Sequence, residues 1–375
     1  MKRILMNIAL AASILLLFSC NQSPLFYNIS KETPPKDPVV AGTPSKIVES
    51  SVSGAPKLYV ANGRVWEYDG STWKQTAGQP SGDFKEVAAT TGTGAALYAL
   101  SVEGTGSTST KLWKSIDGTT WTLVTNNTGY PILGGIFGAS DTLFAGARNS
   151  DTSQAAVLYD HSGTLMTALG PVAISDAVPG TLVGAVQMGG NYYLAVSGKG
   201  VYAADTANDF GTASPIYGTN DTKYKLNGLI ALNNQVVAVG SGGYMLAGNS
   251  DSFSEVSGAS DTSYPYTGAL AVWTSGTDTL LLAGRRYSYS TYTNGYWEVT
   301  LSSGDQLGTT VTMNKPGAGS PTTVADTATY EQSLGQKVIT ALYQAPGGAL
   351  GTTLFASTLK DGLWAYRNNA WNAEE

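Results

Sequence analysis

The sequence predicts an all-β fold, a seven-bladed β-propeller, and two observations lead to this prediction. From Lys46 onward the chain shows short β-rich runs separated by Gly, Asn, Asp and Ser turns, and it lacks the apolar spacing of an amphipathic helix. One strand pattern also returns seven times at nearly constant intervals. A unit of about 40 to 50 residues that recurs in this way is typical of a four-stranded propeller blade.

The recurring strand places a bulky pair just before a small residue, in the form Leu-Tyr-x-Ala or a close variant. Its copies begin at Leu58, Leu97, Leu143, Tyr193, Val236, Leu281 and Leu354. The strand after each copy carries one bulky residue, at Trp66, Trp113, Leu158, Tyr202, Met245, Trp297 and Trp364. These residues are separated by 47, 45, 44, 43, 52 and 67 positions, so five of the six intervals fit one blade each.

Small apolar residues precede most copies, as the innermost strand around a crowded channel requires. These runs span 133–139, 182–188, 226–232, 267–273 and 338–344. Residues 46–375 form the predicted propeller, with about 47 residues per blade; six or eight blades are the alternatives if a weak repeat is miscounted. The last interval is long because it includes an expected insertion at about 305–336, and whether residues 36–41 fasten the ring as an edge strand is left open.

The first 19 residues have the layout of a secretory signal. Lys2 and Arg3 precede an apolar run from Ile4 to Phe18, and Ser19 is a small residue before the expected cleavage point. The run of 15 residues is shorter than the roughly 20 residues that cross a bilayer as a helix. The sequence therefore predicts that residues 1–19 are removed on export.

Cys20 is the only cysteine in the chain, and it directly follows this signal. The residues Leu17-Phe18-Ser19-Cys20 resemble the lipobox of bacterial lipoproteins, although Phe18 is bulkier than the usual residue. The resemblance implies that Cys20 is acylated, for example by palmitate, and that it anchors the mature protein in a membrane. Residues 20–45 are rich in proline and are expected to form a flexible tether. We expect a lipid-anchored protein of the bacterial cell envelope, at the outer membrane, either on its periplasmic side or at the cell surface.

The charge balance argues against two classes of partner. Loss of Lys2 and Arg3 with the signal lowers the formal net charge from −6 to −8. An acidic chain with 13% charged residues is poorly suited to bind nucleic acid or anionic lipid headgroups. We expect a monomeric propeller whose surface recognises its partner by hydrogen bonds.

Two blades contain the same short turn sequence. It is Asp-Gly-Ser-Thr-Trp at residues 69–73 and Asp-Gly-Thr-Thr-Trp at residues 117–121. Asp-Gly between apolar residues predicts a tight hairpin with positive φ at both central positions, and the tryptophan is expected to pack between blades. The predicted structural turn residues are Asp69, Gly70, Trp73, Asp117, Gly118 and Trp121.

The segment from Lys111 to Trp121 resembles the Asp-box of sialidase-like propellers, known as BNR repeats, with one residue fewer between Asp and Gly. In that family the box is a structural hairpin away from the active site, so the resemblance implies the fold and not the chemistry. Sialidases use an arginine triad and a Tyr-Glu pair. This chain has no Arg-Ile-Pro segment, and its only histidine, His161, lies in a predicted turn. We therefore expect no catalysis, no cofactor and no metal site.

The lengths of the connections predict which face of the ring binds a partner. Four antiparallel strands place the first-to-second and third-to-fourth turns on one face, the short-turn face. The second-to-third and between-blade connections lie on the other, the long-loop face, to which we also assign the whole insertion. Tyrosine and arginine side chains there could stack on sugars, anchor a protein or hold an acidic group. The expected ligand-binding residues are Arg148, Tyr264, Tyr266, Arg285, Arg286, Tyr287, Tyr289 and Tyr292. Alternatively, these tyrosines only cover a blade edge.

Three functional classes follow from these predictions. The leading hypothesis is an envelope lipoprotein whose long-loop face binds a protein or glycan. The alternatives are a scaffold for envelope protein assembly and a glycosidase or lyase using carboxylates such as Asp141, Asp221 or Asp261. No spacing of these carboxylates favours the enzyme.

Overall fold

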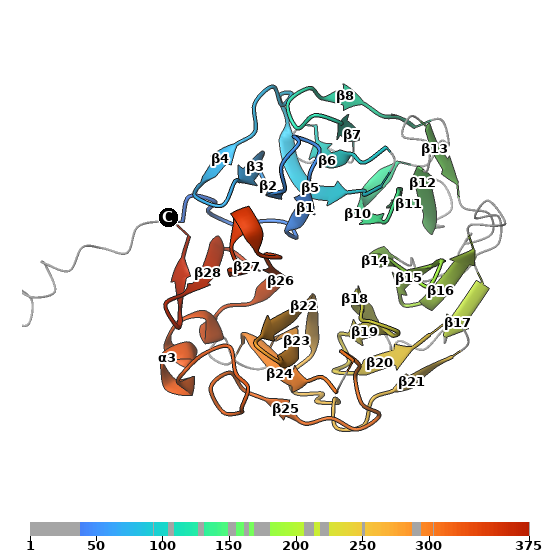
Figure 1. The fold of residues 1–375 in the computed structure, drawn as a ribbon. Coiled ribbons are helices and arrows are strands. Elements are labelled where there is room, and N and C mark those ends of the chain that lie inside the picture. The colour runs from blue at the N-terminus through green and yellow to red at the C-terminus, as the bar shows by residue number, and fades with distance from the viewer. Residues whose placement is uncertain are drawn as a thin grey trace, which may run out of the picture. The chain divides into compact units, whose positions relative to one another are not determined.

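The structure is a computed structural model, and it describes residues 38–92, 94–103, 109–126, 131–148, 155–160, 165–168, 181–205, 214–217, 225–249, 252–286, 294–302 and 304–374. Within these residues the chain forms seven mainly antiparallel sheets arranged as blades around a channel (Figure 1). The predicted seven-bladed β-propeller is confirmed. No helix among the described residues has the length and hydropathy needed to span a membrane.

Each blade begins at the channel and runs outward. The innermost strands are β1 (Val48–Ser50), β5 (Asp83–Ala89), β10 (Ile132–Ala139), β14 (Thr181–Met188), β18 (Leu226–Ala231), β22 (Tyr266–Ser275) and β26 (Ile339–Gln344). The second strands are β2 (Lys57–Asn62), β6 (Leu97–Val102), β11 (Thr142–Arg148), β15 (Asn191–Ser197), β19 (Val236–Gly240), β23 (Asp278–Arg285) and β27 (Leu354–Thr358). All seven predicted Leu-Tyr-x-Ala copies lie in these second strands.

The outer half of each blade completes the sheet. The third strands are β3 (Arg64–Tyr68), β7 (Thr110–Ser115), β12 (Ala155–Asp160), β16 (Gly200–Asp205), β20 (Met245–Gly248), β24 (Tyr296–Thr300) and β28 (Leu363–Arg367). The fourth strands are β4 (Trp73–Gln75), β8 (Thr122–Leu123), β13 (Leu165–Ala168), β17 (Ser214–Tyr217), β21 (Phe253–Glu255), β25 (Met313–Asn314) and β29 (Ala370–Ala373). Blade 3 has a fifth strand, because β9 (Thr125–Asn126) pairs in parallel with β13.

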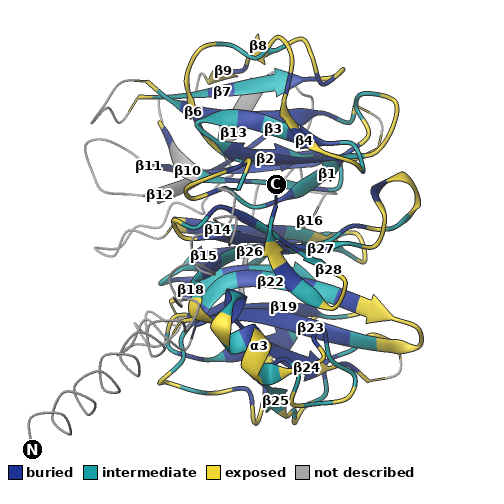
Figure 2. Cartoon of the chain, turned by 90° about the vertical axis from the view of Figure 1, so that its left-hand side faces the viewer, coloured by how far each residue is buried: buried dark blue, intermediate teal, exposed yellow. Residues whose placement is uncertain are grey.

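The core consists of seven apolar clusters, one between each pair of neighbouring blades. Successive side chains of a strand point to opposite faces of a sheet, so a blade packed on both sides needs apolar residues on both faces. The second strands meet this need, since Val236–Gly240 is buried at every position. The buried strands form continuous layers in a side view of the ring, and exposure is concentrated at connections and outer edges (Figure 2).

The ring closes between blades 7 and 1 without a strand shared by the two blades. The backbone N–H of Val39 donates to Glu374 O at 2.9 Å, and that of Leu363 donates to Val40 O at 3.0 Å. The hydroxyl of Tyr343 in β26 donates to the Glu49 carboxylate in β1 at 2.8 Å. Residues 38–45 therefore fasten blade 1 to blade 7, which answers the question that the sequence left open. The expectation of a flexible tether was wrong for these residues, because their backbone is hydrogen-bonded to both blades and Val40 is buried.

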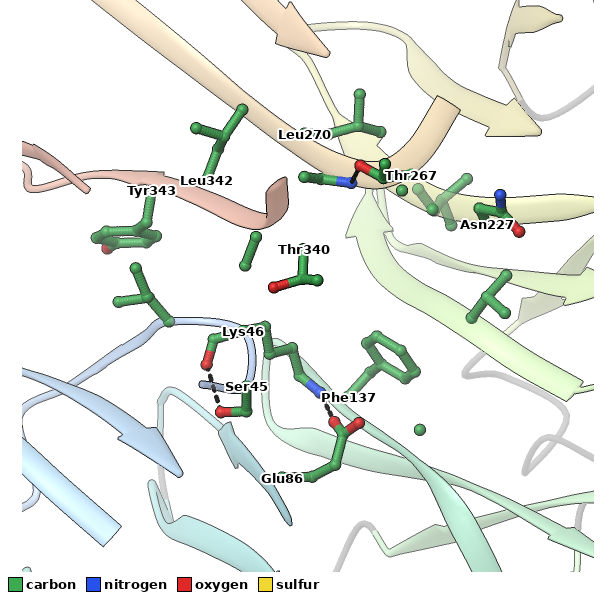
Figure 3. A pocket seen from close by; sticks show the side chains of 18 of the residues that line it. Ser45, Lys46, Glu86, Phe137, Asn227, Thr267, Leu270, Thr340, Leu342 and Tyr343 are labelled. Atoms are coloured by element: carbon green, nitrogen blue, oxygen red, sulfur yellow. Dashed lines mark hydrogen bonds and ion pairs between the residues drawn. The ribbon is translucent and has the colours of Figure 1, made fainter. Parts of the chain in front are cut away.

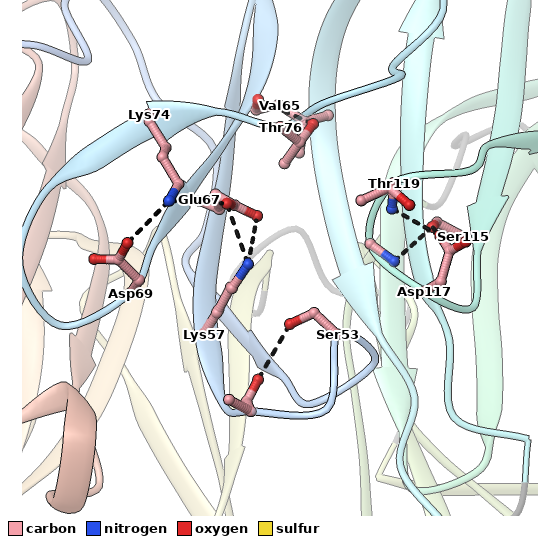
Figure 4. Close-up of polar contacts among 12 residues, drawn as sticks. Ser53, Lys57, Val65, Glu67, Asp69, Lys74, Thr76, Ser115, Asp117 and Thr119 are labelled. Atoms are coloured by element: carbon pink, nitrogen blue, oxygen red, sulfur yellow. Dashed lines mark hydrogen bonds and ion pairs between the residues drawn. The ribbon is translucent and has the colours of Figure 1, made fainter.

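The predicted turn of blade 2 differs from the expected two-residue hairpin. Gly118 has φ of +77°, whereas Asp117 is not among the described residues with positive φ. Instead, Asp117 Oδ1 accepts a hydrogen bond from the backbone N–H of Thr119 at 2.7 Å (Figure 4). It accepts a second from the backbone N–H of Thr120 at 2.6 Å. The side chain thus caps a longer loop, so the aspartate backbone need not enter the left-handed region. These bonds hold the pKa of the Asp117 carboxyl well below its usual range.

The turn of blade 1 is capped in the same way. Asp69 Oδ1 accepts from the Ser71 hydroxyl at 2.6 Å and from the Ser71 N–H at 3.1 Å. Lys74 Nζ lies 3.0 Å from Asp69 Oδ2 (Figure 4). Hydrogen bonds from Ser71, followed by that from Lys74, lower the pKa of the Asp69 carboxyl. Gly70 has φ of +101°. Both turns therefore use glycine for the positive φ and aspartate for its side chain.

The tryptophans after these turns pack between blades, as predicted. Trp73 lies with its ring centroid 5.8 Å from that of Phe355 in blade 7. Trp121 packs against the cluster between blades 2 and 1, and its ring centroid lies 6.5 Å from that of Phe84 in its own blade. Trp371 of blade 7 contacts Tyr296 of blade 6, with 6.1 Å between ring centroids. Each tryptophan therefore packs back toward the preceding blade.

The segment expected as an insertion includes part of a blade. Residues 305–336 contain β25, the fourth strand of blade 6, and the short helix α3 (Thr327–Gln332). Residues before β25 form a third-to-fourth connection, so they lie on the short-turn face. There, Leu307 N donates to Gln235 Oε1 of blade 5 at 2.9 Å. Assigning the whole insertion to the long-loop face was therefore wrong for the residues before β25, because the sequence did not reveal the two-residue strand.

A buried carboxylate attaches the second part of this segment to blade 6. Glu298 in β24 is 1% exposed, and it accepts hydrogen bonds from the backbone N–H of Thr323 at 2.8 Å and the hydroxyl of Thr322 at 2.9 Å. Burial raises the pKa of the Glu298 carboxyl, and these bonds partly oppose that shift. The segment is therefore held by specific polar contacts as well as by apolar packing.

Candidate functional site

The predicted binding residues on the long-loop face separate into buried and exposed groups. Arg285 ends β23 and is 1% exposed, and its Nε donates to Asn294 O at 3.0 Å. Its guanidinium lies 3.9 Å from the ring centroid of Trp297 and 4.8 Å from that of Tyr264. Desolvation lowers the pKa of Arg285. The side chain is therefore enclosed by the contacts of blade 6, in contrast to the expected surface position.

Tyr266 is also buried by the fold. It is 2% exposed, and its hydroxyl donates to Ala259 O at 2.6 Å. Burial raises the pKa of the Tyr266 hydroxyl above its usual range. Tyr264 packs edge-on against Trp297, with 5.7 Å between ring centroids. Arg286 is exposed, and its backbone N–H donates to Pro265 O at 2.9 Å. Of the predicted residues whose side chains are described, Arg286 is exposed, Tyr264 is partly buried, and Tyr266 and Arg285 are buried.

The other predicted residues cannot be placed with their side chains. Arg148 ends β11, but its side chain lies outside the described part of the structure. Tyr287, Tyr289 and Tyr292 lie outside the described residues, as do Cys20, His161 and Asp221. The binding role of these residues therefore stays a prediction.

Two of the three carboxylates considered for catalysis lie on opposite faces of the ring. Asp141 lies in the first-to-second turn of blade 3 and accepts a hydrogen bond from Tyr192 at 2.6 Å. Asp261 lies in the connection between blades 5 and 6, where it accepts from the Ser263 N–H at 3.0 Å. These two carboxylates do not form a pair. Among the described residues, no group of three or more His, Cys, Asp or Glu side chains could hold a metal ion.

Sequence reasoning missed a cavity in the central channel. Its volume is about 730 Å³, and innermost strands or the residues just before them line it from all seven blades (Figure 3). Most lining residues lie in the first halves of these strands, which follow the between-blade connections. The cavity therefore occupies the part of the channel that adjoins the long-loop face.

One ion pair lies in this cavity. Lys46 Nζ is 2.6 Å from Glu86 Oε2, and the two side chains are 23% and 31% exposed. The same ammonium lies 4.2 Å from the ring centroid of Phe137. Figure 3 shows Lys46 and Glu86 beside Phe137, with Thr340 and Asn227 on other parts of the wall. A sequence signal for this region exists in the glycines of the innermost strands, since glycine inside a strand often marks a bulge.

The likeness of the chain to solved structures is confined to the fold. No family model and no curated protein matches it. One similar structure is the extracellular domain of a hybrid two-component system from B. thetaiotaomicron, with a TM-score of 0.52, 13% identity, and coverage of 88% of this chain and 39% of that one. Another is PorZ, described as a surface component of the type-IX secretion system of Porphyromonas gingivalis, with a TM-score of 0.50, 10% identity, and coverage of 90% and 39%.

A third similar structure has nearly the same length as this chain. It is YCF48 bound to D1 peptide, with a TM-score of 0.50, 13% identity, and coverage of 89% of this chain and 96% of that one. The chain spans about two fifths of the length of the other two proteins. At these identities the likeness extends to the propeller architecture.

Proposed function

We propose that this protein is a lipid-anchored binding protein of a bacterial cell envelope, and that its long-loop face captures a protein or glycan without catalysis. The observation that best supports the proposal is the cavity of about 730 Å³ at that face, set in a closed ring. Rigid scaffolds commonly carry binding sites in such positions, because the frame holds the contact groups in place at low entropic cost.

The proposed location rests on the signal layout and on Cys20. Two of the similar structures are described as an extracellular domain and a bacterial surface component, which agrees with export. A diacylglycerol and an N-acyl chain on Cys20 would exceed the two-chain requirement for stable anchoring. The part of the expected tether that precedes the ring closure, residues 20–37, would then let the propeller reach partners away from the bilayer surface.

A scaffold for envelope assembly is the second candidate function. One similar structure is described as a component of a secretion system, and this is the observation that favours a scaffold. In either case the protein would act by binding. The identity of the captured partner would therefore distinguish a binding protein from a scaffold for envelope assembly.

The proposal is tested by affinity capture from envelope extracts of cells grown with a palmitate analogue. We expect the full-length protein to carry the label and retain a defined partner, and Cys20→Ser to lose the label. Deletion of residues 287–292 combined with Arg286→Ala should abolish capture with little change in Tm. The control is Asn234→Ser, which alters an exposed residue on the short-turn face.

Two results would contradict this proposal. Equal labelling of wild type and Cys20→Ser would exclude the anchor. Unchanged capture by the loop variant would exclude the long-loop face as the binding surface.

A further inference from the structure

The innermost strands share an irregularity near one position. In six blades the residue-to-residue pairing between the first and second strands shifts at a corresponding place. The shift lies opposite the residues that follow the alanine of the Leu-Tyr-x-Ala pattern in the second strand. Blade 1 is the exception, and residues 43–47 before its short strand β1 line the same part of the channel. A β-bulge leaves one residue unpaired and redirects its side chain. The repeated bulges therefore mark a ring of redirected residues inside the channel.

Each of the six blades contributes at least one bulge residue to the wall of the cavity. These residues are Lys85 in blade 2, Gly135 in blade 3, Val183 in blade 4, Asn227 in blade 5, residues 267–269 in blade 6 and Thr340 in blade 7. Blade 3 has another register shift, at Leu133, whose side chain lies outside the described part of the structure. Bulges are frequent at the rims of closed sheets and next to binding sites, where they re-aim side chains. We call this ring, together with Lys46 and Glu86, the channel collar.

The collar has hydrogen-bonding capacity that the described protein does not use. Thr340 Oγ1 is buried and has no hydrogen-bond partner among the described residues. Asn227 Nδ2 donates to Tyr266 O at 2.7 Å, and the carbonyl oxygen of this side chain has no bond to a described residue. A buried hydroxyl without a partner costs free energy, because it has lost its bonds to water. The residue Thr340 as a whole is partly exposed and lines the cavity, so a rotation about its Cα–Cβ bond would bring the hydroxyl to a ligand and recover that loss.

The charges of the collar are already compensated. Lys46 Nζ is 2.6 Å from Glu86 Oε2, and Lys85 Nζ is 2.7 Å from Asp83 Oδ2. A charged ligand would have to compete with one of these carboxylates or ammonium groups. A neutral ligand need not, because Lys46 uses one of its three N–H donors on Glu86 and the second carboxylate oxygen of Glu86 can still accept. The pair can therefore donate to one hydroxyl and accept from another without separating.

Apolar side chains complete the wall of the cavity. Leu229, Leu270 and Leu342 line it from three successive blades. Figure 3 shows Leu270 and Leu342 on the same side of the cavity as Thr340. A sugar ring combines hydroxyl groups around its edge with C–H groups on its faces, and so it matches a wall of this mixed chemistry. The volume of about 730 Å³ lies within the range of about 300–1,000 Å³ that holds compact ligands.

We propose that the channel collar binds an uncharged, hydroxyl-rich ligand, the end of a neutral saccharide. Lys46 and Glu86 bind hydroxyl groups as donor and acceptor, and Thr340 and Asn227 bind further hydroxyl groups across the cavity. The site lies inside the channel and requires none of the loop residues 286–292. This assignment rests on the proposed function, because the same cavity supports capture at the long-loop face. It deepens that function by assigning a neutral saccharide to the channel. The experiments separate the channel from the loop residues.

The proposal is tested by calorimetry and ligand-observed NMR on the full-length protein. The neutral probes are glucose, galactose, N-acetylglucosamine and their β-1,4-linked dimers, and the charged probes are glucuronic acid and glucosamine. We expect at least one neutral probe to bind at millimolar concentration and the charged probes to bind more weakly. Thr340→Val removes one neutral hydrogen bond and should weaken binding roughly threefold to tenfold. Glu86→Gln removes a charged acceptor and should weaken it on the order of tenfold or more.

The matched control is Thr76→Val. Thr76 is 4% exposed and follows the outer strand of blade 1, where its hydroxyl donates to Val65 O at 3.4 Å. This variant removes the same hydroxyl group outside the collar, so it should leave saccharide affinity unchanged. Thr340→Val should keep the wild-type Tm, because its hydroxyl has no partner to lose among the described residues.

Three outcomes would overturn the proposal. The first is that none of the neutral probes binds the wild-type protein. The second is that a charged probe binds as well as its neutral counterpart. The third is that binding persists unchanged in both Thr340→Val and Glu86→Gln, which would place the saccharide elsewhere. Deletion of residues 287–292 separates the two proposals, because it should abolish partner capture and preserve saccharide binding.

Discussion

The Asp-Gly turns of blades 1 and 2 have nearly the same sequence and the same local hydrogen bonds, but their surroundings differ. In both, an aspartate oxygen accepts from the backbone N–H groups two and three residues later. A Cβ added to Gly70 would lie 2.0 Å from the backbone oxygen of Ala349 in blade 7. A Cβ added to Gly118 would come no closer than 3.3 Å, to the hydroxyl of Tyr59.

The difference arises from the place of each blade in the ring. Blade 1 meets blade 7 at the closure, where Trp73 is 4% exposed and packs against Tyr68 and Phe355. Blade 2 meets blade 1 within the continuous chain, and Trp121 there is only partly buried. One local motif therefore has two structural roles: a turn in blade 2, and a turn that also seals the ring in blade 1.

Among pairs of variants at these turns, the two tryptophan variants are expected to differ most in the free energy of unfolding that they lose. Trp73→Ala should lower the free energy of unfolding by about 3–5 kcal/mol, because it opens a cavity at the closure of the ring. Trp121→Ala should cost less than about 3 kcal/mol, since part of its surface is exposed in the native protein. Equilibrium unfolding in denaturant measures both. Equal losses would mean that the closure resembles any other interface between blades.

Replacement of the two glycines by alanine should destabilise the protein to different extents, for a steric reason. Both have positive φ, so Gly118→Ala should cost about 1–2 kcal/mol from backbone strain alone. Gly70→Ala should cost about 1–3 kcal/mol more, because its Cβ collides with backbone that cannot move away as a side chain can. The two variants are controls for each other in thermal and denaturant unfolding. A smaller loss for Gly70→Ala would contradict the close approach to blade 7.

The aspartates should have the smallest effects, and these depend on pH. The pKa of each carboxyl is lowered in the folded protein, so its stabilising effect is complete above the unfolded value of about 3.9. That effect is lost as the pH falls through the folded value. Asp69→Ala and Asp117→Ala should therefore lower Tm by a few degrees at neutral pH, and the difference from wild type should shrink in acid.

Salt should separate the two aspartates. Lys74 lies 3.0 Å from Asp69, whereas the shift at Asp117 comes from uncharged hydrogen-bond donors. An exposed ion pair is screened by salt. Added salt should therefore reduce the Asp69→Ala effect and leave the Asp117→Ala effect nearly constant. An equal response of the two variants would argue against a role for Lys74.

The periodic part of the fold was readable from the sequence. Every Leu-Tyr-x-Ala copy lies in a second strand, because a strand buried on both faces needs consecutive apolar residues, and this leaves a local pattern. The strands β9 and β25 were not predicted. Each has two residues, and its pairing depends on partners elsewhere in the chain.

The candidate sites were less predictable than the blades. Arg285 and Tyr264 were selected as surface groups, but the guanidinium lies between aromatic rings from two segments of the chain. Thr340 has no glycine beside it to mark a bulge, and Gly228 next to Asn227 is a signal for a bulge that does not identify the redirected side chain. Only the register between paired strands reveals such a position.

The sequence by itself determined the number of blades, the second strand of each and the turns that aspartate and glycine form. These features depend on residues close together in the chain and on one repeated pattern of burial. The tertiary structure alone decided how the ring closes, which arginine is enclosed and which side chains enter the channel. Those features depend on contacts between blades, and the side chains that meet there are separated by tens to hundreds of residues.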